Sequence, residues 1–183
     1  PDLGLENGAG MRVETLRKIL ETVRGTVDRL LESNPDDDRL LRSKATMLDN
    51  FATVYLAAGD LKNAQAAARE GLDLRLTLVR RDPGWAMGYR DLSVSRERLG
   101  DVTLQAGDPP GALAAYEKAL EITRKLATLK GNEALIARDE AIMLTRIGDV
   151  KLQLGDRRGA LAAYESGLNV ARRLAAQSPR DLQ

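Results

Sequence analysis

Arginine side chains recur at one fixed spacing along this chain of 183 residues. Arg42, Arg90 and Arg138 lie 48 residues apart, and a row of leucines follows with the same spacing. The members of this second row are Leu56, Leu104 and Leu152. A guanidinium group binds carboxylates or carbonyl oxygens through directed hydrogen bonds, and leucines bind apolar side chains. These residue types indicate recognition of another molecule rather than bond-breaking chemistry.

The groups that most enzymes use for catalysis are missing from this sequence. It contains no histidine and no cysteine, so the commonest general base, the thiolate nucleophile and the usual zinc ligands are all absent. Its carboxylates have basic neighbours, no two of them stand out as an acid and a base, and there is no glycine-rich phosphate loop. We therefore predict that the protein is not an enzyme and has no catalytic residues, no cofactor and no metal site.

The balance of charges argues against two classes of partner. The chain has 28 Lys and Arg residues against 27 Asp and Glu residues, which gives a net charge of +1. Nucleic-acid-binding domains instead carry a basic excess on one face. No apolar run approaches the roughly 18 residues that a transmembrane helix needs. The sequence thus predicts no binding to nucleic acid or membrane, and a cytoplasmic location.

A repeat of 48 residues organises the chain. The dipeptide Gly-Asp occurs at 59–60, 107–108 and 155–156, and an alanine-rich helical pattern follows each copy. Glycine can adopt the left-handed conformation that ends a helix, and aspartate can cap the helix that follows. Each Gly-Asp pair therefore predicts the turn of a helix hairpin. Hairpins repeated at a fixed period are typical of a solenoid, in which each repeat contacts its neighbours.

Hydrophobic periodicity gives the expected positions of the helices. The first helices of the hairpins are expected near 37–58, 84–106 and 133–154. The second helices are expected near 61–81, 109–129 and 157–177. An amphipathic stripe over residues 11–33 has the phase of the second helices and represents half a repeat.

These positions predict an all-α protein with one repeat domain at residues 11–179. The domain consists of a half repeat at 11–35 followed by full repeats at 36–83, 84–131 and 132–179. Residues 1–10, which hold three glycines, are expected to be a flexible lead-in, and residues 180–183 a tail.

The hairpins resemble those of the tetratricopeptide repeat family. The second repeat carries the family's small and aromatic residues at Leu99, Gly100, Gly107, Ala112, Tyr116 and Ala119. The third repeat carries them at Leu144, Ile147, Gly148, Gly155, Ala160 and Tyr164. The period exceeds the family's usual length of about 34 residues by about four helical turns, so the chain is similar to a long-helix bacterial variant. The resemblance implies a right-handed α-solenoid of antiparallel hairpins with about three and a half repeats.

In this family the first helices line a concave groove. The groove positions that carry over to this chain are Arg42, Asp49, Asn50, Arg90, Glu97, Arg98, Asp101, Leu104, Arg138, Thr145, Arg146, Asp149 and Leu152. The resemblance therefore implies a non-catalytic scaffold for protein–protein interaction that binds a peptide or a partner protein in this groove. It also implies that the chain is part of a larger bacterial signalling protein.

Two alternatives remain open at this point. The candidate groove residues could be structural, with Arg146 paired to Asp149 in its own helix and the arginine row tying neighbouring repeats together through Asp91 and Asp139. The chain could also be an assembly module that stacks into homo-oligomers through its exposed end helices. Light scattering at several concentrations separates that alternative from a monomeric scaffold.

Overall fold

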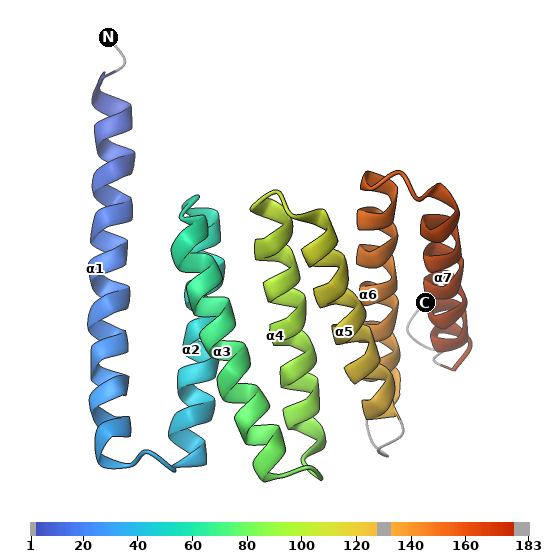
Figure 1. Cartoon of the computed structure of the whole chain (residues 1–183), viewed down its shortest axis with the longest axis horizontal. Coiled ribbons are helices and arrows are strands. Elements are labelled where there is room, and N and C mark those ends of the chain that lie inside the picture. The colour runs from blue at the N-terminus through green and yellow to red at the C-terminus, as the bar shows by residue number, and fades with distance from the viewer. Residues whose placement is uncertain (1–2, 128–132, 178–183) are drawn as a thin grey trace. The chain divides into compact units, whose positions relative to one another are not determined.

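The computed structural model describes residues 3–127 and 133–177, and their regular structure is helical (Figure 1). The helices in these ranges are α1 (Leu3–Ser33), α2 (Asp38–Ala57), α3 (Leu61–Arg81), α4 (Ala86–Gln105), α5 (Pro109–Ala127), α6 (Glu133–Gln153) and α7 (Arg157–Gln177). None of the described residues forms a strand. The predicted fold class, an all-α array of antiparallel helix hairpins, is confirmed. Residues 128 and 129, expected to extend α5, lie outside the described ranges.

The turns inside the hairpins have the geometry that the Gly-Asp pairs predicted. Backbone φ angles of 74°, 82° and 83° belong to Gly59, Gly107 and Gly155. These angles lie in the left-handed region that favours glycine. The aspartate after the glycine caps the next helix: Asp108 accepts a hydrogen bond from the backbone N–H of Gly111 at 2.9 Å, and Asp156 accepts one from Gly159 at 2.8 Å.

Helix α1 begins at Leu3, whereas the sequence predicted a flexible lead-in over residues 1–10. Glycines at 4, 8 and 10 each weaken a helix by about 1 kcal/mol relative to alanine, but the segment after Pro1 contains no proline that would end it. Extending an existing helix is far easier than nucleating a new one, so the amphipathic stripe that follows propagates toward the N-terminus. Residues 1–2 and 178–183, which include the predicted tail, lie outside the described ranges.

The chain divides into two compact units, Pro1–Leu74 and Arg75–Gln183. The first unit contains α1, α2 and most of α3. In this unit Gly71 of α3 lies against α2, where a Cβ added to the glycine would sit 3.4 Å from Leu48 Cβ. Arg17 of α1 forms an ion pair with Asp60 at 2.6 Å, which ties α1 to the start of α3. The repeat boundaries proposed within residues 11–179 stay predictions.

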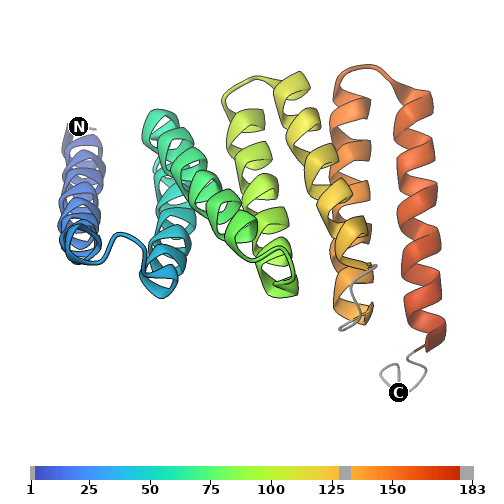
Figure 2. The ribbon, with the colours of Figure 1, turned by 60° about the horizontal axis from the view of Figure 1, so that its bottom comes forward.

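The second unit contains the end of α3 and the two hairpins α4/α5 and α6/α7 (Figure 2). Helix α5 contacts α4 within its own hairpin and α6 of the next. Buried apolar side chains from α5, α6 and α7 form one core cluster, in which Tyr116 is wholly buried. The other buried members are Ala112, Ala119, Leu120, Met143, Leu144, Ile147, Val150, Ala163 and Val170. This shared core fixes the spacing of the two hairpins and so positions their first helices, α4 and α6.

Candidate functional site

Ion pairs join the candidate groove residues of α4 to helix α6. Arg90 Nε of α4 donates a hydrogen bond to Asp139 Oδ2 of α6 at 2.9 Å, and both side chains are partly buried. This contact confirms, for Arg90, the structural alternative in which the arginine row ties neighbouring repeats together. The guanidinium group of Arg90 therefore helps to hold the two first helices in place.

Arg146 makes a second link between the same two helices. Its Nε lies 2.9 Å from Glu97 Oε1 and its Nη1 lies 2.8 Å from Asp101 Oδ1, so one guanidinium group bridges two carboxylates of α4. The guanidinium carbon also lies 5.8 Å from the centre of the Tyr116 ring, within the range of a cation–π contact. The structure thus replaces the expected pair of Arg146 with Asp149, because two carboxylates face the arginine from the neighbouring helix.

The surroundings of this cluster change the acidity of its groups. Burial raises the pKa of Glu97 above its ordinary value of 4.5, although Arg146 acts in the opposite direction. Burial acts to lower the pKa of Arg146, but the carboxylates of Asp101 and Glu97 raise it above the ordinary value of 12.5. Burial and the hydrogen bond to Asp101 raise the pKa of the Tyr116 hydroxyl far above 10.0. None of these groups is poised to exchange a proton near neutral pH, so the cluster suits structural support.

Tyrosines on the second helices hold two of the candidate carboxylates. Tyr116 Oη donates a hydrogen bond to Asp101 Oδ1 at 2.6 Å, and Tyr164 Oη donates one to Asp149 Oδ1 at 2.7 Å. The two contacts are the same interaction repeated 48 residues apart. Asp101 and Asp149 are therefore oriented by their own hairpins, which limits the directions in which they can meet a ligand.

Other candidate residues of the second unit present accessible side chains. Arg138, Thr145 and Leu152 of α6 are exposed, and 52% of the Leu152 surface is accessible. Thr145 Oγ1 donates a hydrogen bond to the Ala141 carbonyl at 3.0 Å, which leaves the acceptor lone pairs of the hydroxyl available. On α4, Arg98 is half-buried, and Leu104 packs against the core cluster. Helix α6 thus carries the more accessible set.

The candidate residues of the first unit lie on α2 and differ in their exposure. Asn50 is exposed and Arg42 is half-buried. Asp49 departs from the prediction, because its side chain is only 4% exposed and cannot contact a ligand in an open groove. The cause is the close approach of α3 at Gly71, where an added Cβ would lie 3.3 Å from Asp49 Oδ1.

One buried polar contact of the second unit had no signal in the sequence. Arg75, near the end of α3, donates from Nε to Ser95 Oγ at 2.6 Å, and its Nη1 lies 3.4 Å from Asp91 Oδ2. Both Arg75 and Ser95 are buried. A buried arginine must be paired, and here the small serine leaves room for its guanidinium group. The contact joins two helices, so we assign it a structural role.

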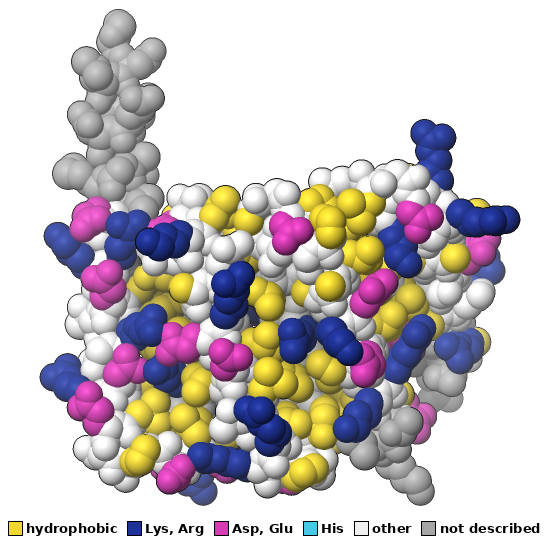
Figure 3. Space-filling model, in the orientation of Figure 1, with side chains coloured by type: hydrophobic (Ala, Val, Ile, Leu, Met, Phe, Trp, Pro, Cys, Tyr) yellow, Lys and Arg dark blue, Asp and Glu magenta, His cyan; other side chains and the backbone are white. Residues whose placement is uncertain are grey.

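The charged side chains of the protein do not gather by sign on the face shown in Figure 3, where basic and acidic groups are interspersed. Across the described ranges, no cluster of three or more carboxylates is placed to hold a metal ion. None of the described helices combines the length and the apolar composition needed to cross a bilayer.

Comparisons with known proteins agree with the repeat pattern. Two similar solved structures are the crystal structure of MamA and the DHF79 filament, each with a TM-score of 0.38. The first is 14% identical and covers 89% of this chain and 95% of that chain. The second is 18% identical and covers 92% of this chain and 89% of that chain. The sequence matches none of the curated proteins. A family model described as tetratricopeptide repeat matches residues 93–127, and this match confirms the resemblance of the chain to the tetratricopeptide repeat family.

Proposed function

We propose that this chain is a non-catalytic protein–protein interaction scaffold that binds a peptide segment of a partner along its first helices. The observation that carries the proposal is the exposed set Arg138, Thr145 and Leu152 on α6. These side chains offer a cation, a hydroxyl and an apolar group in one direction along one helix. The match of residues 93–127 to a family of repeats supports the same function.

The ion pairs beneath this set give it a physical advantage. Arg146 bridges Glu97 and Asp101, and Arg90 contacts Asp139, so α6 is held against α4 before any ligand arrives. A surface that is already ordered loses less conformational entropy on binding. We therefore assign the paired residues to support of the groove and the exposed residues to contact with the ligand.

The spacing of the exposed residues defines the peptide that would fit. Arg138 and Leu152 are separated by about 21 Å along α6 at a rise of 1.5 Å per residue. An extended peptide covers that distance with about six or seven residues. The proposed ligand has an acidic residue at the end facing Arg138 and an apolar side chain at the end facing Leu152.

The wider setting of the scaffold also belongs to this proposal. The long-helix hairpins resemble the repeat segments of bacterial signalling proteins, so we assign the chain to a larger protein of that kind, in the cytoplasm. In that setting the repeats would recruit a partner while another part of the protein carries the signal.

Selection of random-sequence peptides on the immobilised chain tests the binding function. Enriched peptides should carry the acidic and apolar residues at the stated spacing and should bind Leu152→Asp about tenfold more weakly or worse, because a buried leucine contributes about 1.5–3 kcal/mol. Leu168→Asp on α7 is the matched control, since 49% of Leu168 is exposed, and it should leave affinity unchanged. Peptides that bind Leu152→Asp as tightly as the parent chain would contradict the proposed groove.

A further inference from the structure

The outer face of hairpin α4/α5 shows how this protein binds a helix. Helix α6 covers that face, and Leu120 of α5 is consequently only 8% exposed. Met143, Leu144 and Ile147 of α6 belong to the same core cluster as Leu120. Hydrophobic burial along α5 is therefore the main attraction between the two helices.

Charged pairs at the edges of this contact fix the orientation of α6. Arg124 Nε of α5 lies 2.8 Å from Glu140 Oε1, and Glu117 Oε1 lies 3.8 Å from Lys151 Nζ. On the α4 side, the pairs with Arg90 and Asp101 described above have the same effect. The face thus reads its helix through an apolar centre and four charged positions.

The same face recurs 48 residues later on hairpin α6/α7, where no described helix covers it. Leu168 stands in the position of Leu120 and is 49% exposed. Tyr164 stands in the position of Tyr116 and is partly exposed, although Tyr116 is wholly buried. Leu161, one turn and a half before Leu168 on a similar face of α7, is also exposed.

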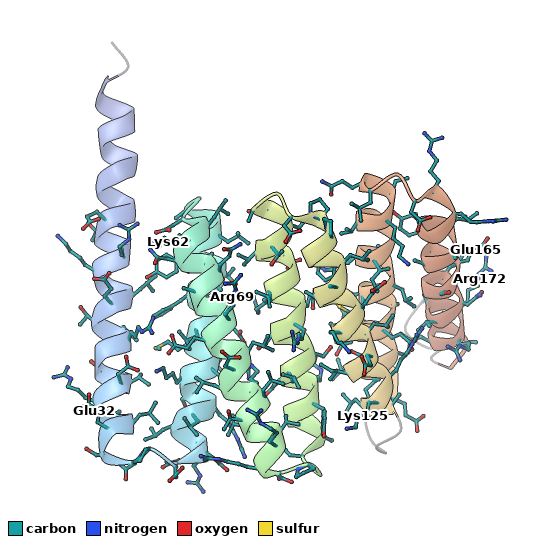
Figure 4. All side chains as sticks on the ribbon, in the orientation of Figure 1. Glu32, Lys62, Arg69, Lys125, Glu165 and Arg172 are labelled. Atoms are coloured by element: carbon teal, nitrogen blue, oxygen red, sulfur yellow. The ribbon has the colours of Figure 1, made fainter. Side chains whose placement is uncertain are left out.

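The charges that orient α6 also recur on this end face. The positions of Arg90, Asp101, Glu117 and Arg124 are filled by Arg138, Asp149, Glu165 and Arg172. Figure 4 shows Glu165 and Arg172 projecting from α7 on the side away from α6. Among the described residues, no ion pair involves Arg138, Glu165 or Arg172. The one substitution is Thr145 in the position of Glu97, so the end face lacks a single carboxylate.

A depression of about 410 Å³ lies between α6 and α7 on this end face. Ile142 and Leu168 line it together with Arg138, Tyr164 and Leu174. Its lining is mostly apolar with one arginine at the edge. The shape and the chemistry are those of a seat for side chains from an amphipathic helix.

We propose that the α6/α7 end face binds an amphipathic helix of a partner protein, and that this helix has the chemistry of α6. It carries acidic residues in the positions of Asp139 and Glu140, apolar residues in those of Met143 and Ile147, and basic residues at the far end. Its acids meet Arg138 and Arg172, its basic groups meet Asp149 and Glu165, and its apolar side chains cover Leu168. This surface is distinct from the proposed peptide groove, and the occupant is a folded helix rather than an extended strand.

A second copy of the chain does not supply such a helix without unfolding. In the second unit, the helices with this chemistry are α4 and α6, and each already packs against α5. In the first unit, α2 has Ser43 and Lys44 in the positions of the two acids, so its charges do not match Arg138 and Arg172. Charge complementarity therefore selects a separate partner helix.

A labelled synthetic peptide of residues 133–153, which is α6 itself, is the probe that tests this proposal with the full chain. Fluorescence anisotropy should show saturable binding that Leu168→Asp weakens by about tenfold or more. Arg172→Glu should weaken binding by about threefold or more, and a peptide with Glu140→Arg should recover most of that loss on the Arg172→Glu chain. Met87→Asp is the control, because Met87 is 49% exposed on α4, and it should change nothing.

Three outcomes would overturn the proposal. The first is no saturable binding up to about 1 mM peptide, an affinity that corresponds to only about 4 kcal/mol. The second is binding that Leu168→Asp and Arg172→Glu leave unchanged, because the peptide would then be displacing the chain's own α6. The third is a dimer in sedimentation velocity that Leu168→Asp abolishes, because a second copy would then cover the face. Circular dichroism of each variant confirms that the helices are intact.

Discussion

The ring of Tyr116 lies so close to Gly100 that a Cβ at position 100 would fall 2.5 Å from Tyr116 Cε1. Tyr164 and Gly148 repeat this contact in the next hairpin, again at 2.5 Å. The glycine on the first helix of each hairpin therefore makes room for the tyrosine on the second. This pairing sets the approach of the helices that carry Asp101 and Asp149.

Replacing Gly100 with alanine tests this contact. The added methyl group forces the buried Tyr116 ring to move, so the free energy of unfolding should fall by about 1–3 kcal/mol even though alanine favours a helix. Urea denaturation followed by the fluorescence of Trp85, the only tryptophan, reports on this unit. Gly148→Ala should cost less, since Tyr164 is partly exposed and its ring can shift toward solvent.

Gly167→Ala is the matched control for these substitutions. Gly167 is also a helical glycine of the second unit, but the nearest atom to an added Cβ is Leu144 Cβ at 3.4 Å, an ordinary contact. The residue in the same position of α5 is Ala119. Gly167→Ala should therefore stabilise the protein by up to about 1 kcal/mol. Equal losses for positions 100 and 167 would show that the tyrosine contact is not what restricts Gly100.

Truncation of the two tyrosines should separate the centre of the array from its end. Tyr116→Ala should lower the free energy of unfolding by about 3–5 kcal/mol, because it empties a fully buried site and removes the hydrogen bond to Asp101. Tyr164→Ala should cost clearly less, since part of that ring is already in water. A loss below about 1 kcal/mol for Tyr116→Ala would be incompatible with its place in the core.

The helical framework was predictable because its signals are local. The Gly-Asp pairs predicted the turns at Gly59, Gly107 and Gly155, and the repetition of Tyr116 at Tyr164 predicted equivalent second helices. Only the backbone conformation of one residue and the periodicity of its neighbours enter these inferences. The start of α1 was missed because glycines reduce the helical signal without ending a helix.

The ion pair between Arg146 and Glu97 should be worth more than an exposed pair of the same kind. A double-mutant cycle with Arg146→Ala and Glu97→Ala should give a coupling of about 1 kcal/mol, because the Glu97 side chain is 21% exposed and screened from water. The control cycle uses Lys118 and Glu121, whose side chains are 62% and 69% exposed and whose coupling should be about 0.3 kcal/mol or less. Indistinguishable couplings would show that the α4–α6 link does not stabilise the unit.

The pKa of Glu97 makes part of the stability depend on pH. Burial raises the pKa of Glu97 above 4.5, so the folded state binds its proton more tightly than the unfolded state does. The contribution of Glu97 to stability is therefore greatest at acidic pH and falls as pH rises from about 4.5 through the raised value. Urea denaturation of the parent chain and of Glu97→Gln at about pH 4 and about pH 7 measures it. The parent should lose stability relative to the variant on going to pH 7, and the opposite trend would mean that Arg146 outweighs burial.

The partners of the long charged side chains were beyond prediction from sequence. Spacing along one helix suggested Asp149 for Arg146, but a guanidinium group on a flexible side chain reaches the facing helix, where Glu97 and Asp101 offer two carboxylates. Burial of Asp49 depends on how closely α3 approaches at Gly71, which only the packed hairpin reveals. The recurrence of Arg90 at Arg138 was visible, whereas the pairing of the first with Asp139 was one of two open readings.

The most direct test of the proposed scaffold function is an NMR map of the peptide-binding surface. Amide chemical shifts of the labelled chain are followed while a selected peptide is added. The largest changes should fall on α6 around Arg138, Thr145 and Leu152 and on the facing part of α4, and Leu152→Asp should abolish them. Changes centred on α5 or α7, or a map that Leu152→Asp leaves unaltered, would contradict a binding site on the first helices.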